Sequence, residues 1–182
     1  LAGSITAFDL YSSAKDGFDI AYETVSGNAV VVYCDGDTTP SYRVWDGNSW
    51  STASSVTASV LTDDCRWIDM ASDPSSNEIA LIMRGVAGDL YQVLVWDAAT
   101  QTWGNSSTFG EARVGTYSGQ AITYNQAGTE ALAVAPDGGP GNSGNNSMQY
   151  NTWNGTAWSG GTGQTIDGRI YWAGLAPAVA TN

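Results

Sequence analysis

The stretch YRVWDGNSWS, residues 42–51, places two tryptophans on either side of an Asp-Gly pair, and YNTWNGTAWSG repeats the arrangement at residues 150–160. Asp-Gly and Asn-Gly tolerate the positive φ of a tight turn, so each stretch predicts a β-hairpin. A middle copy, VLVWDAATQTWG at residues 93–104, has two more residues between its tryptophans. An even insertion keeps the second tryptophan on the same strand face. The hairpins therefore predict a repeated β structure.

The hairpins belong to a repeat of about 50 residues, because the turn residues Gly27, Asn77 and Gly128 lie 50 and 51 positions apart. Each copy predicts a short strand, then an apolar strand covered on both faces, then an alternating strand, and a fourth strand that begins at the second tryptophan. The short strands are expected at 18–23, 67–72 and 120–125, and the apolar strands at 29–33, 79–83 and 131–135. The predicted fold class is all-β: repeated four-stranded antiparallel meanders, propeller-like or β-sandwich-like, with incomplete terminal repeats.

We expect a single all-β domain over residues 1–182, a length that can enclose one substantial core. RIYWAGLAPAV at 169–179 resembles RWIDMASDP at 66–74, so a further copy is expected to begin near the end of the sequence. The predicted units are an N-terminal strand (1–17), three repeats (18–66, 67–118 and 119–168) and a partial repeat or terminal strand (169–182).

The six hairpin tryptophans have two interpretations. Residues that flank a turn can pack as cross-strand aromatic pairs, which is a structural role. If the same rings were exposed in all three repeats, they would instead form a platform for stacking sugars. The residues concerned are Trp45, Trp50, Trp96, Trp103, Trp153 and Trp158.

Composition excludes several classes of function. The chain has 18 acidic and 6 basic residues, a formal net charge of −12, and no histidine. Scattered arginines and a single lysine argue against nucleic acid and anionic membranes as partners. No apolar run is long enough for membrane insertion. Without histidine, Ser-His-Asp and Cys-His catalysis are excluded, and no spacing singles out a glycosidase carboxylate pair, so we predict that the protein is not an enzyme.

Several features favour an oxidising, extracellular compartment. Cys34 and Cys65 could form a disulfide that closes a loop of about 31 residues, the alternative being two buried thiols. Sequons at Asn105, Asn145 and Asn154 are candidate glycosylation sites in Gly/Ser/Asn-rich loops. The sequence opens at Leu1 without a signal segment, as expected of a processed product. We expect a secreted protein, outside the cell or on its surface.

Calcium is the one cofactor that the sequence suggests. Asp35 and Asp37 follow the first cysteine, and Asp63 and Asp64 precede the second. A disulfide would bring these carboxylates together, and hard oxygen ligands from flexible loops suit Ca²⁺. Ordinary acidic turns are the alternative interpretation.

From residue 18 to 175 the repeats resemble the Trp-containing, β-propeller-like repeats of bacterial and archaeal extracellular proteins, and more loosely kelch-type blades. The resemblance implies a propeller-like arrangement of sheets. Closed propellers typically have four to eight blades, whereas this chain has three full repeats. Either the N-terminal and C-terminal strands join into a composite fourth blade within one chain, or the ends of the repeat array remain open.

An open sheet edge can pair with another chain, so we expect strand exchange between copies. Because donor and acceptor surfaces differ, such a contact can build a filament or tube. The predicted function is a structural subunit that polymerises with itself; the alternative is an extracellular glycan-binding or adhesion module. The predicted assembly-strand residues are Ile5, Ala7, Phe8, Leu10, Ile170, Trp172, Leu175 and Val179.

Overall fold

The computed structural model describes residues 17–59, 61–85, 91–110, 119–137, 147–160 and 162–165. Across these ranges the chain forms three four-stranded antiparallel sheets. The first sheet contains β1 (Phe18–Tyr22), β2 (Ala29–Tyr33), β3 (Ser41–Trp45) and β4 (Ser54–Ser55). The second contains β5 (Cys65–Ser72), β6 (Ile79–Gly85), β7 (Tyr91–Asp97) and β8 (Thr102–Phe109). The third contains β9 (Ala121–Tyr124), β10 (Ala131–Asp137), β11 (Ser147–Trp153) and β12 (Thr162–Thr165).

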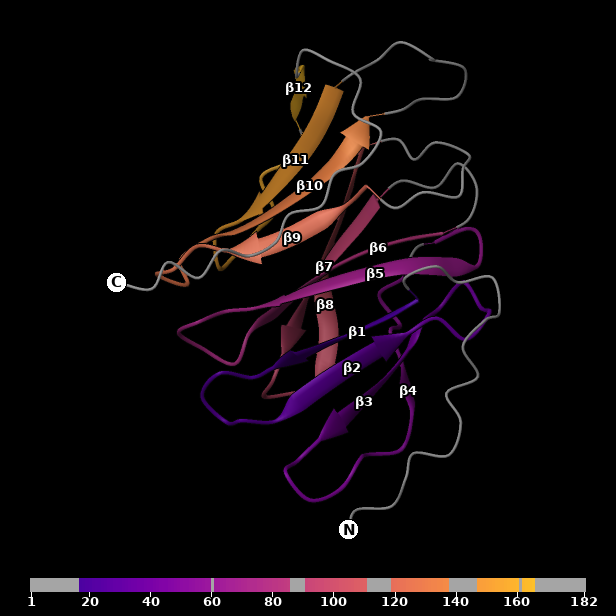
Figure 1. Cartoon of the computed structure of the whole chain (residues 1–182), viewed down its shortest axis with the longest axis vertical. Helices are drawn as coiled ribbons and strands as arrows, with labels where there is room; N and C mark the ends of the chain where they lie inside the picture. Colours follow the sequence, from indigo (N-terminus) through magenta and orange to yellow (C-terminus); the bar gives the residue numbers. More distant parts are fainter. Residues whose placement is uncertain are drawn as a thin grey trace.

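The predicted all-β class of repeated meanders is confirmed, since strands follow one another in order within every sheet. Figure 1 shows the three sheets side by side, with the second between the other two. Their first strands, β1, β5 and β9, are neighbours, as in a propeller-like arrangement. Within the described ranges, no helix has the length and apolarity needed to cross a bilayer.

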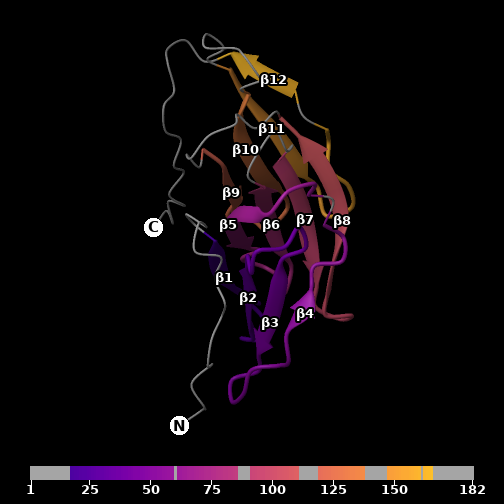
Figure 2. The same ribbon diagram turned by 90° about the vertical axis from the view of Figure 1, so that its right-hand side faces the viewer.

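Two cores hold the sheets together, one on each face of the second sheet. The first core lies against the first sheet and includes Val30, Val32, Leu81 and Leu94. The second lies against the third sheet and includes Ala80, Ile82, Val93 and Ala133. Neighbouring residues of β6 thus serve opposite cores, which is why β6 is buried along its whole length. Figure 2, turned by 90°, shows the same stacking of sheets.

The fourth strands of the first and third sheets differ from the prediction. Trp50 and Trp158 each make only an isolated bridge to the first tryptophan of their hairpin, and β4 and β12 begin later in the chain. The serine side chain after each second tryptophan replaces one of the two backbone bonds at that point: Val44 N–H donates to Ser51 Oγ (3.0 Å), and Thr152 N–H donates to Ser159 Oγ (3.2 Å). The serine N–H groups still donate to the Val44 and Thr152 carbonyls (both 2.8 Å). The second sheet has Gly104 at this position, and there β8 starts at Thr102.

The loops that join the first two strands of each sheet lie along one end of the molecule (left side of Figure 1). These loops span 23–28, 73–78 and 125–130, and we call them the hairpin loops. In the first two, Asn77 Oδ1 accepts the N–H groups of Val25 (2.9 Å) and Ser26 (2.8 Å). The third approaches the second so closely that a Cβ on Gly128 would lie 2.0 Å from Asp73 Oδ1.

Gly128 allows us to test the contact between hairpin loops. Gly128→Ala should lower the free energy of unfolding by about 1–2 kcal/mol more than Gly27→Ala. Both glycines have positive φ, +67° and +78°, but a Cβ on Gly27 meets nothing within 4 Å. Asp73 cannot move away cheaply, because it is buried and its Oδ1 accepts the Ser75 N–H (2.8 Å). Urea unfolding measures both variants, and equal losses would contradict this packing.

Candidate functional site

Two carboxylates of the hairpin loops, one buried and one half-buried, accept hydrogen bonds from tryptophans of the following sheet. Glu23, only 2% exposed, accepts the indole N–H of Trp96 at 2.7 Å, a contact from the first sheet to the second. Its other oxygen accepts the Ser26 hydroxyl and the Asn28 amide (3.1 Å for Asn28). These neutral donors satisfy the carboxylate within the protein. Because the acceptor is charged, such hydrogen bonds are stronger than those between two neutral groups.

A second contact of this kind joins the second sheet to the third. Glu78 Oε1 accepts both the Trp153 indole N–H (2.6 Å) and the Tyr124 hydroxyl (2.7 Å). Burial, followed by the hydrogen bond and negative charge of Glu78, raises the pKa of Tyr124, which therefore remains a donor. We call this two-donor arrangement the Tyr-Trp clamp.

Two aspartates connect the first strands of neighbouring sheets. Asp19 Oδ2 accepts the Met70 N–H of β5 (2.8 Å), and Asp69 Oδ2 accepts the Ile122 N–H of β9 (3.2 Å). Burial raises the pKa of Asp19. Burial and the nearby negative charge of Asp19 raise the pKa of Asp69 to about 6. Each carboxyl group thus ties its own sheet to the next.

The predicted tryptophan pairs all form. Ring centroids lie 5.5 Å apart for Trp45 and Trp50, 5.3 Å for Trp96 and Trp103, and 5.5 Å for Trp153 and Trp158. Their surroundings differ from one sheet to another. Trp96, Trp103 and Trp153 are between 1% and 5% exposed, whereas the Trp45–Trp50 pair is half-buried. The described hairpins therefore do not present three equivalent sugar platforms.

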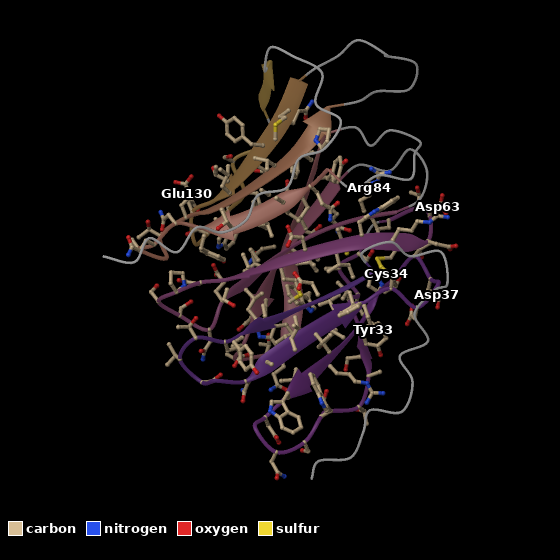
Figure 3. All side chains as sticks on the ribbon, viewed as in Figure 1. Tyr33, Cys34, Asp37, Asp63, Arg84 and Glu130 are labelled. Atoms are coloured by element: carbon tan, nitrogen blue, oxygen red, sulfur yellow. A yellow bond between two sulfur atoms is a disulfide. The ribbon has the colours of Figure 1, made fainter. Side chains whose placement is uncertain are left out.

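A disulfide joins Cys34 to Cys65 across the first two sheets, closing a separation of 31 residues. Figure 3 shows Cys34, Asp37 and Asp63 at the end of the sheets opposite Glu130. Two of these acidic residues have local partners: Asp35 Oδ2 accepts the Ser41 hydroxyl (2.6 Å), and Asp63 accepts the N–H of its neighbour Asp64 (2.7 Å). Asp35 Oδ1 is buried without a hydrogen-bond partner among the described residues. In the described part of the chain, no three His, Cys, Asp or Glu side chains lie close enough together to hold a metal ion, and calcium binding stays a prediction.

Two of the three sequons lie on exposed positions of the structure. Asn105, in β8, has φ +47°, and its carbonyl accepts the Trp158 indole N–H at 2.7 Å. Asn154 is exposed in the third tryptophan hairpin. Asn145 lies outside the described residues. The predicted assembly strands, with residues Ile5 to Leu10 and Ile170 to Val179, also lie outside them.

Arg84 is a buried cation that sequence reasoning missed. It is 2% exposed, and its guanidinium lies 4.2 Å from the centre of the Trp67 ring and donates to the Tyr91 hydroxyl at 3.3 Å. Burial is the main cause that raises the pKa of Tyr91, against the charge of Arg84. The sequence shows Arg84 at the end of an otherwise apolar strand, which is a signal that could have marked it. It does not show which aromatic residues contact the guanidinium.

The first sheet carries a row of exposed apolar side chains on β1. Phe18, Ile20 and Tyr22 are 56%, 47% and 58% exposed, and Val25 in the adjoining hairpin loop is 70% exposed. Because side chains alternate along a strand, the three β1 residues share one face. Ala21, on the opposite face, belongs to the core against the second sheet. The exposed row therefore points away from the rest of the described structure.

These features define an all-β protein of repeated four-stranded antiparallel sheets, which carboxylate hydrogen bonds join to one another. Among solved structures it is similar to hydrazine synthase of Kuenenia stuttgartiensis, with a TM-score of 0.50 and 12% identity over 75% of this chain and 38% of that chain. At that identity the likeness concerns the fold alone. No protein-family model matches the sequence, and a search of curated proteins gives no match.

Asp69 should make stability depend on pH. Its pKa is about 6 in the folded protein and near 3.8 unfolded, so the folded state holds more protons between these values and stability falls as pH rises through that window. Asp69→Asn removes the charge and keeps an oxygen for the Ile122 N–H. We expect the variant to be about 1–2 kcal/mol more stable than the wild type above pH 7, after allowance for solvent screening, and equally stable near pH 4.

The measurement is urea unfolding from pH 4 to 8. Asp46→Asn is the matched control, because the Ser49 and Asn48 N–H groups lower the pKa of this exposed carboxyl group. Its replacement should not raise stability at pH 7. An Asp69→Asn variant that is less stable than the wild type at pH 8 would contradict the assignment.

Proposed function

We propose that this protein is a structural subunit of a secreted extracellular filament, tube or surface assembly, and that it polymerises with itself by exchange of terminal strands. The observation that carries the proposal is the exposed row Phe18, Ile20 and Tyr22 on the outer face of the first sheet. The second sheet has both faces covered, so an apolar sheet face in this fold is normally packed against another sheet. Contiguous exposed apolar surface is typical of association sites.

Two further observations support assembly over catalysis or glycan binding. Three of the six hairpin tryptophans are buried, which favours a role in packing over sugar stacking. The Asp19–Asp69 carboxyl pair accepts backbone N–H groups of the following sheets, a structural use for the residues that would otherwise be candidates for acid–base chemistry. The Cys34–Cys65 disulfide is compatible with an oxidising compartment, which supports secretion as part of the proposal.

Glycan binding is the alternative function, and the Trp45–Trp50 pair favours it. This pair is half-buried and belongs to the sheet with the exposed apolar row. A single aromatic pair could stack one sugar ring. This alternative would be supported if the monomer bound oligosaccharides and the Trp50→Ala variant did not.

Electron microscopy tests the proposed function. The full chain should form ordered polymers, and a variant that lacks residues 1–12 should not, because the donor strand is removed. Circular dichroism of the truncated variant must show that its β structure is intact. Uniform monomers of the full chain at high concentration would contradict self-assembly, and polymers that survive the truncation would contradict exchange of the N-terminal strand.

A further inference from the structure

The donors of the Tyr-Trp clamp lie in one row across the third sheet. Tyr124 pairs with Ala131, and Ala131 pairs with Trp153, so the tyrosine and tryptophan flank an alanine on the same face. The first sheet has the same row: Tyr22 pairs with Ala29, and Ala29 pairs with Trp45. In the second sheet the row is Ser72, Ile79 and Trp96, without the tyrosine.

The row in the first sheet has no acceptor within the described structure. Trp96 and Trp153 both face the preceding sheet, and Trp45 occupies their position in a sheet that none of the described sheets precedes. Tyr22 is 58% exposed, and no hydrogen bond among the described residues engages its hydroxyl or the Trp45 indole N–H. The first sheet thus presents both donors of a clamp on its outer face.

The matching acceptor lies on the third sheet, across the second sheet from the donors. Glu78 closes the second hairpin loop, where its carbonyl accepts the Asp73 N–H (2.9 Å), and Glu130 closes the third in the same way with Asn125 (2.9 Å). Figure 3 shows Glu130 at the hairpin-loop end of the third sheet. It is exposed, and its carboxylate has no partner within the described ranges. The first and third sheets lie on opposite faces of the second, so the donors and acceptor of one chain face apart.

We propose that Tyr22 and Trp45 of one molecule clamp Glu130 of a second copy. The first sheet of one molecule then packs on the third sheet of the next, as the third sheet packs on the second within the chain. The inference rests on the proposed self-assembly and names the surface that carries it. The contact joins different surfaces of two identical chains, so its repetition closes a ring or extends a filament. A ring of two copies would contain six sheets, within the range of closed propellers.

A difference at the innermost strands agrees with this pairing. Within the chain, the N–H groups of Met70 and Ile122 need a carboxylate from the preceding sheet. The third sheet has Ala121 at the position of Asp19 and Asp69, so it supplies no such carboxylate. The Ile20 N–H of the first sheet needs none, because it donates to Asp19 Oδ1 at 2.8 Å. The outer face of the third sheet therefore offers no carboxylate at this position, and the outer face of the first sheet has no free N–H there that would need one.

Sedimentation velocity over a concentration series tests the contact. Glu130→Ala removes the acceptor, and Tyr22→Phe/Trp45→Phe removes both donors and keeps aromatic rings in their place. Each variant should associate at least tenfold more weakly than the wild type, since a hydrogen bond to a charged group contributes about that factor. For a chain of net charge −12, loss of a carboxylate should by itself promote association. Asp97→Ala controls for this effect, because Asp97 is exposed and lies outside the proposed contact.

An equimolar mixture of the two variants gives the decisive result. Each variant retains one half of the contact, so the mixture should form dimers with one intact contact at concentrations where each variant alone, associating at least tenfold more weakly, is still monomeric. Variants that associate as strongly as the wild type would overturn the inference. If polymers vanish when residues 1–12 are removed but persist in Glu130→Ala, strand exchange stands and this surface is wrong. A wild type that remains monomeric would overturn both proposals.

Discussion

The contact between sheets depends on a carboxylate that accepts hydrogen bonds from neutral donors of the next sheet. Glu23 with Trp96, and Glu78 with Trp153 and Tyr124, fix where one hairpin loop lies relative to the following sheet. The apolar cores supply most of the favourable free energy, but the hydrophobic effect has no direction. The carboxylate contacts provide that direction, because a carboxylate that loses water is costly unless its donors are correctly placed.

The acidic composition explains why the donors are neutral. With 18 acidic and 6 basic residues, most carboxylates cannot find a cation in the same chain. Indole N–H, hydroxyl and backbone N–H groups take that place at Glu23, Glu78 and the Asp19–Asp69 pair. Such contacts depend less on ionic strength than exposed ion pairs do. A protein held together in this way can keep its structure over a wide range of salt concentrations.

The sequence predicts the fold well because its strongest signals are local. The period of about 50 residues, the apolar runs at 29–33 and 79–83, and the paired tryptophans all correspond to observed strands and hairpins. The carboxylate contacts could not be predicted from the sequence. Glu23 is the first residue of its hairpin loop and Glu78 is the last residue of the next one, so the two do not occupy the same position in the repeat. The late starts of β4 and β12 were also missed, since they depend on a serine side chain that bonds across the hairpin.

Calcium binding stays a prediction, and the structure shows why the disulfide alone does not decide it. A disulfide brings two stretches of backbone together, and here the Cys65 N–H donates to the Asp37 carbonyl at 3.0 Å. It does not decide where the carboxylates point, and Asp35 turns to the Ser41 hydroxyl. Side-chain direction in loops depends on local donors that sequence spacing does not reveal.

Hydrogen exchange of the tryptophan indole N–H groups, followed by NMR, tests the carboxylate contacts between sheets most directly. In dilute solution the Trp96 and Trp153 protons should exchange slowly, because opening their bonds to Glu23 and Glu78 requires adjacent sheets to separate. The Trp45 proton should exchange rapidly and become protected only as the protein associates. Rapid exchange at Trp96 and Trp153, at the rate of Trp45, would show that the carboxylate contacts do not hold the sheets together.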